Sequence, residues 1–153
     1  MGMYTELVLG IQLRKLQDHE RYVLEILEYM CGKTKGLDVS KDKLEKEHPL
    51  FQTERWHIML CCDSYYFDGQ TNSFVTYDED STYLTVRCNL KNYDHEIQHF
   101  LDWIARYSDY KYSEFVGYMR YETCDFPTLI YLSDDGVRYG SPTEITWLTE
   151  DLV

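Results

Sequence analysis

The strongest constraint on the fold is an internal repeat, because the chain carries the same strand-then-helix pattern twice. Residues 7–13 alternate apolar side chains with others, as a strand with one buried face does, and residues 18–30 then show helical apolar spacing. Residues 84–90 and 94–107 repeat this plan, and a one-residue deletion in the joint aligns the two blocks. The repeat predicts a duplicated architecture.

Two further strands are expected after each helix. In the first half they are residues 55–67 and 72–77, with one turn of helix at 40–47 in the loop before them. In the second half they are residues 114–121 and 128–132, followed by a turn into 137–139. Each half therefore follows the order strand, helix, strand, strand.

This order predicts an α+β fold built as a two-layer sandwich, in which an antiparallel sheet carries two helices on one face. Right-handed connections place the first strands of the two β-α-β-β units at the centre of the sheet, related by a pseudo-two-fold axis. We expect a single domain over residues 1–153, with one unit at about 5–80, a second at about 81–141 and an acidic tail at 142–153.

The charge of the chain limits its partners. Twenty-seven acidic residues against 15 Lys and Arg give a net charge of −12, which disfavours direct binding to nucleic acid or to anionic membranes. A host protein with a basic surface is the expected partner. Acidic residues gather in turns, and on position alone ordinary turn chemistry is the favoured explanation for them. If the turns converge, the partner-binding residues are Asp78, Glu79, Asp80, Asp134 and Asp135.

Cysteine usage and hydropathy indicate the compartment. The five cysteines are an odd number without CxxC spacing, and 15 tyrosines suit half-buried sheet surfaces. No apolar run approaches the roughly 18 residues of a membrane span, and no basic-then-apolar leader opens the chain. These features predict a reduced, cytoplasmic protein, and no motif calls for a cofactor.

One stretch matches the zinc-protease motif H-E-x-x-H, namely His95, Glu96 and His99. At about 100° per residue the two histidines point away from the apolar stripe of the helix, and the motif lies in the first helical turn with Asp94 as its cap. We therefore interpret it as a solvated helix face and expect no metal site and no catalytic residue. A zinc hydrolase is the third of three functional hypotheses.

The sheet face away from the helices offers the second hypothesis, a small-molecule site. Strand alternation places a half-polar, aromatic set there: Gln12, Met59, Tyr83, Arg87, Asn89, Tyr118 and Arg120. Tyr83, Arg87, Tyr118 and Arg120 are the candidates for binding a small anionic or planar ligand. A homodimer interface and a solvated face explain the same pattern.

Three segments carry a resemblance to known proteins: residues 3–13, residues 63–67, and residues 90–94 together with 100–104. They resemble small uncharacterised proteins of bacteriophages and mobile elements of Firmicutes-like bacteria. The order of elements is similar to that of duplicated gyrase-inhibitory-protein-like ligand-binding domains. The resemblance implies a context in which small acidic proteins inhibit host systems, and it transfers no site residue. The leading expectation is thus a non-enzymatic inhibitor or accessory factor of the anti-defence type.

Overall fold

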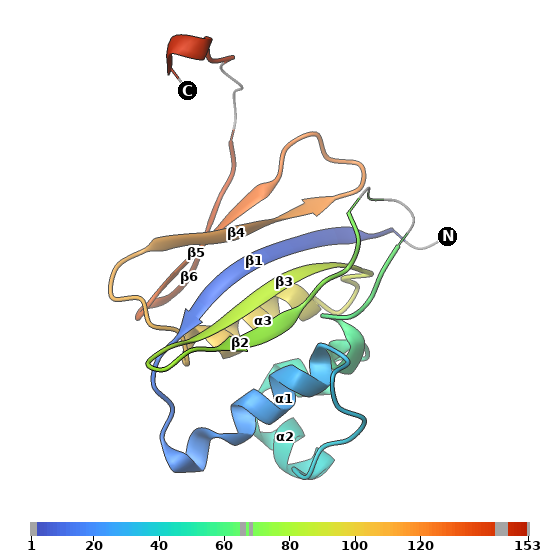
Figure 1. Cartoon of the computed structure of the whole chain (residues 1–153). Helices are drawn as coiled ribbons and strands as arrows, with labels where there is room; N and C mark the ends of the chain where they lie inside the picture. Colours follow the sequence, from blue (N-terminus) through green and yellow to red (C-terminus); the bar gives the residue numbers. More distant parts are fainter. Residues whose placement is uncertain (1–2, 65–66, 68, 143–146, 153) are drawn as a thin grey trace.

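The computed structural model describes residues 3–64, 67, 69–142 and 147–152. Six strands form one sheet in the order β2-β3-β1-β4-β5-β6, and all neighbouring strands are antiparallel (Figure 1). The predicted α+β class with an antiparallel sheet is confirmed. The strands are β1 (Thr5–Leu13), β2 (Phe74–Tyr77), β3 (Thr82–Leu90), β4 (Glu114–Tyr121), β5 (Thr128–Ser133) and β6 (Gly136–Gly140).

Three α-helices and four 3-10 turns complete the described part of the chain. The helices are α1 (Tyr22–Met30), α2 (Lys41–Glu47) and α3 (Glu96–Ala105), and the turns are η1 (Asp18–Glu20), η2 (Pro49–Gln52), η3 (Trp56–Ile58) and η4 (Glu150–Leu152). Among the described residues, no helix combines the length and apolar character needed to cross a membrane.

The two repeated strands lie side by side at the centre of the sheet. β1 pairs with β3 along its whole length, with Leu7 opposite Cys88 and Ile11 opposite Leu84. The alternating apolar side chains of both strands are buried in the same core as the apolar stripes of α1 and α3. Strand alternation therefore selects the face on which the helices pack.

The first strand and helix of each half are connected in the same way. α1 leads from β1 to β2, which pairs with β3, and α3 leads from β3 to β4, which pairs with β1. The second half continues through β5 and β6, whereas the first half carries α2, η2 and η3 instead. Duplication about a pseudo-two-fold axis stays a prediction.

The strand predicted at residues 55–67 is wrong. Trp56 begins η3, and Met59 and Leu60 after it are fully buried, so three apolar residues follow the i, i+3, i+4 spacing of a helical turn. Trp56 also packs edge-to-face on Phe51, with ring centroids 4.9 Å apart. This packing removes Met59 from the open sheet face, where we expected it. Residues 65 and 66 of the predicted strand lie outside the described residues.

The helices begin later than the sequence pattern indicates. η1 precedes α1, and α3 begins at Glu96 because His95 adopts a left-handed conformation with φ +57°. His95, rather than the predicted Asp94, is the N-cap residue of α3, and Asn92 Oδ1 accepts a hydrogen bond from the Ile97 amide of the first turn at 2.9 Å. Asp94 instead accepts one from the amide of Glu54.

Candidate functional site

The two predicted acidic turns lie at the same end of the sheet. Asp78, Glu79 and Asp80 join β2 to β3, and Asp134 and Asp135 join β5 to β6. β1 ends here and β4 begins here, since Leu13 pairs with Thr82 and Glu114 with Leu132. Three strand-to-strand steps separate β3 from β5, which is roughly 14 Å. We call these five residues the acidic edge.

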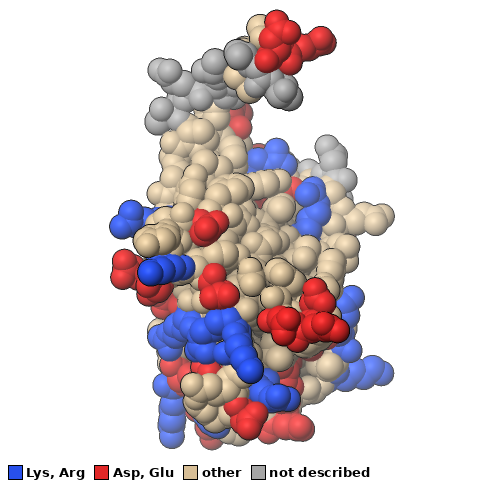
Figure 2. Space-filling model, turned by 60° about the vertical axis from the view of Figure 1, so that its left-hand side comes forward, with Lys and Arg blue, Asp and Glu red and all other residues tan. Residues whose placement is uncertain are grey.

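The acidic edge is exposed and carries no ion pair. All five side chains are exposed, and none lies within 4.0 Å of a Lys or Arg nitrogen in the part of the chain that the structure describes. The two turns are separated by the three strand-to-strand steps between β3 and β5. On the face that Figure 2 shows, acidic groups stand apart, with basic and uncharged groups between them. The two turns are therefore located where the sequence predicted them, and they share one end of the sheet without forming a continuous patch.

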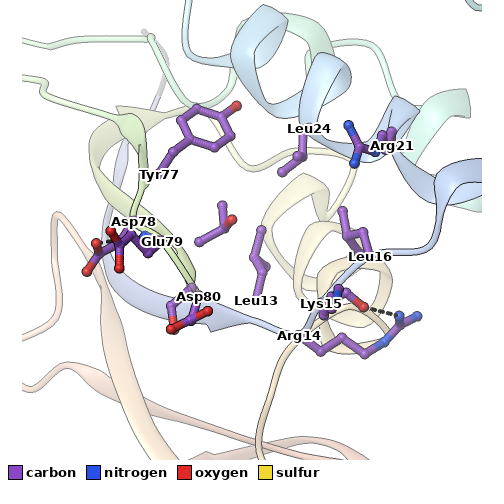
Figure 3. A pocket seen from close by; sticks show the side chains of 12 residues that line it. Leu13, Arg14, Lys15, Leu16, Arg21, Leu24, Tyr77, Asp78, Glu79 and Asp80 are labelled. Carbon is purple, nitrogen blue, oxygen red and sulfur yellow. Dashed lines mark hydrogen bonds between the residues drawn. The ribbon is translucent and has the colours of Figure 1, made fainter.

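The β2–β3 turn also forms one wall of a cavity of about 390 Å³. The opposite wall is the joint between β1 and α1, which carries Arg14, Lys15 and Arg21. Figure 3 shows the apolar side chains of Leu13 and Leu24 between the acidic and the basic groups. The cavity thus has an apolar centre and rims of opposite charge. Sequence patterns do not predict the cavity, because they identify this joint only as a connection between a strand and a helix.

Arg14 anchors the basic wall. Its guanidinium donates two hydrogen bonds to Glu20, of 2.9 and 2.6 Å, and lies over the ring of Tyr107. The hydrogen bond from Arg14 lowers the pKa of Glu20 to about 2. Lys15 is exposed and has no ion pair among the described residues, and Arg21 meets only the exposed Asp18, at 3.5 Å. Lys15 and Arg21 therefore remain available to a ligand.

The two arginines of the open sheet face are already occupied. Arg87 and Arg120 converge from either side on Glu6, at 3.3 and 3.4 Å from its carboxylate oxygens. Glu6 is only 2% exposed. The ring of Phe67 lies over the Arg120 guanidinium at 5.0 Å. Because an internal carboxylate occupies the space between the arginines, this face offers less to an anionic ligand than the sequence indicates. The sequence pattern did not single out Glu6 as a site residue, although Glu6 lies two residues before Val8 in the strand and therefore shares this face.

The predicted tyrosines of the open face differ in their distance from the arginine cluster, because Tyr118 lies two residues before Arg120 on β4, whereas Tyr83 lies further along β3, opposite Gln12. Tyr83 is 39% exposed, and Tyr118 pairs across the strands with Val8. Gly10 of β1 is exposed and leaves the sheet surface flat, with no atom within 4 Å of the position that a Cβ would take. Gly10 therefore leaves open space on this face between Gln12, which pairs with Tyr83, and Val8, which pairs with Tyr118.

The zinc-protease motif is not assembled. His95 is exposed, but His99 is half-buried and packs edge-to-face near His48, so the expectation that both histidines face solvent is wrong for His99. Glu96 is fully buried in the first turn of α3, and burial raises its pKa. Within the described residues, no three His, Cys, Asp or Glu side chains gather in a metal-binding arrangement.

A buried histidine that the sequence analysis did not single out has a structural role. His48 Nδ1 accepts a hydrogen bond from the Leu50 amide at 3.0 Å, so its Nε2–H donates to Asp102, at 2.8 Å. Both ring nitrogens are thus engaged, and the pair fastens the chain after α2 to α3.

The site residues are assigned from this geometry and charge alone. No protein-family model, no curated protein and no solved structure matches the chain significantly.

Proposed function

We propose that this chain is a non-enzymatic binding protein that engages a basic surface of a partner protein through the acidic edge. The observation that carries the proposal is the placement of five exposed carboxylates at one end of the sheet, without ion pairs in the described chain. Carboxylates that the protein does not neutralise attract a basic partner and speed its encounter.

Aromatic side chains near the acidic edge supply contact area. Tyr77 precedes the β2–β3 turn and is 55% exposed, and Phe115 at the start of β4 is also 55% exposed. Tyr112 just before β4 is 73% exposed. Large aromatic side chains provide most of the binding energy at many protein interfaces, while charged residues form the rim. Together they make an acidic, tyrosine-rich surface.

The charge of the chain and its resemblance to phage proteins together favour one biological setting. A chain of net charge −12 with a resemblance to small phage proteins fits an inhibitor or accessory factor that acts on a host protein in the cytoplasm. A host surface that normally binds nucleic acid would be suitably basic.

The test compares two variants with the same net charge. The triple variant Asp78→Asn, Glu79→Gln, Asp80→Asn removes three charges from the acidic edge. The control Asp42→Asn, Asp125→Asn, Asp151→Asn removes three exposed charges elsewhere. Binding of a fluorescent octalysine peptide is measured at low and high salt. We expect the edge variant to bind at least threefold more weakly than the control at low salt, and the difference to shrink at high salt. Equal affinities of the two variants would contradict the proposal.

A further inference from the structure

The cavity between the β2–β3 turn and the β1–α1 joint has the character of a ligand site. We propose that it binds a small zwitterion of about dipeptide size, with its ammonium group toward the acidic turn and its carboxylate toward Lys15 and Arg21. This inference does not rest on the proposed function, since it concerns the hollow behind the turn rather than the outer surface of the acidic edge.

The size and lining of the cavity fit such a molecule. Its volume of about 390 Å³ lies in the range typical of small-molecule sites, and its lining is more polar than that of most such sites, which suits a charged ligand. Leu13, Leu16 and Leu24 supply apolar surface in the centre, and Tyr77 adds an aromatic ring (Figure 3). An apolar ligand side chain would be removed from water against these residues.

The charges at the two rims define the ligand class. The acidic side is the turn that carries Asp80, with the Asp78 and Glu79 carboxylates on its outer side in Figure 3, and the basic side carries Lys15 and Arg21. In the described chain, none of these acidic side chains lies within 4.0 Å of a basic side chain of the opposite wall. A ligand with a single charge would meet one favourable and one unfavourable rim. A molecule with an ammonium group at one end and a carboxylate at the other is attracted at both rims.

Both walls are held in place before any ligand binds. The Asp78 amide donates to the Ser81 carbonyl at 2.8 Å, which closes the β2–β3 turn. On the other side the Arg14 amide donates to the Tyr107 carbonyl, also at 2.8 Å, and the Arg14 side chain is fixed by Glu20. A site whose walls are already ordered loses less conformational entropy on binding.

The first experiment varies the ligand. Binding of the dipeptide alanyl-leucine to the full chain is followed by NMR chemical-shift titration, beside its N-acetyl form and its C-terminal amide. We expect saturable shifts at residues of both walls with alanyl-leucine, and at least tenfold weaker binding when either charge is blocked. Absence of saturable binding, equal affinity for the three compounds, or shifts confined to another part of the chain would overturn the inference.

The second experiment varies the two walls. Lys15→Gln should weaken the binding of alanyl-leucine at least threefold. It should leave the affinity for the C-terminal amide unchanged, because the amide has no carboxylate for Lys15 to contact. Asp80→Asn should weaken the binding of alanyl-leucine but not that of its N-acetyl form, which has no ammonium group for Asp80 to contact. Lys46→Gln, an exposed lysine on α2, is the charge-matched control and should change nothing. Because Lys15→Gln leaves every carboxylate of the acidic edge in place, failure here and failure of octalysine binding are separate results.

Discussion

Glu6 is only 2% exposed, and its carboxylate forms ion pairs with Arg87 and Arg120 of the two neighbouring strands. Removing one partner of a buried ion pair is costly because the remaining charges lose their compensation. The arginine side chains are 38% and 42% exposed, so water screens part of that cost. We expect Glu6→Ala to lower the free energy of unfolding by about 2–3 kcal/mol and Glu6→Gln by less.

Urea denaturation measures both losses, and the exposed Glu54→Ala serves as the control, with an expected change within about 0.5 kcal/mol. A Glu6→Ala variant as stable as this control would show that the two arginines do not depend on Glu6.

Glu96 should make stability depend on pH. Burial, followed by the charge of Asp94, raises the pKa of Glu96 above its ordinary value of 4.5 in the folded chain. The folded state therefore binds this proton more tightly than the unfolded state. The stabilising contribution is fully present below pH 4.5 and is lost as the pH rises through the folded pKa.

Glu96→Gln cannot ionise, so its stability relative to the parent chain should improve between pH 4 and pH 7. Unfolding free energies from urea denaturation at the two pH values give this difference, and groups common to both chains cancel. A difference that stays constant with pH would show that Glu96 titrates normally.

At the scale of secondary structure, sequence patterns worked where one face of an element is buried and failed where tertiary contacts decide. β4 has the predicted bounds, and the stripe of α1 is buried as expected. Residues 56–60 fit both a strand and a helical turn, and contact with Phe51 selects the turn. The site was harder to predict because strand register decides that Glu6 lies between two arginines, and sequence spacing within one strand carries no register.

Two glycines test the pairing of β1 with its neighbours. Gly117 of β4 has φ +154°, and a Cβ there would lie 1.9 Å from the carbonyl oxygen of Val8. Gly117→Ala must push β1 and β4 apart, so we expect a loss of about 2 kcal/mol or more in unfolding free energy. Gly10→Ala has open space around its Cβ and should change stability by less than about 1 kcal/mol. Thermal denaturation of the two variants provides the comparison, and equal effects would contradict the close approach at Gly117.

At the scale of the whole molecule, the net charge of −12 opposes the compact state through self-repulsion. The two acidic turns are roughly 14 Å apart across the sheet. This separation is shorter than the screening length of about 30 Å at 10 mM salt and longer than the 10 Å at 0.1 M. Added salt should therefore relieve the repulsion between the turns, although it also weakens surface ion pairs, which contribute little.

We expect the melting temperature to rise by about 2–4 °C between 10 mM and 0.1 M NaCl, which corresponds to about 1 kcal/mol for a chain of this size. The triple variant Asp78→Asn, Glu79→Gln, Asp80→Asn should melt higher than the parent chain at 10 mM and respond less to salt. Scanning calorimetry on both chains measures these shifts, with KCl in place of NaCl as a check that ionic strength is responsible. A melting temperature that falls with salt would mean that attractive pairs such as Arg14–Glu20 outweigh the repulsion among the acidic residues.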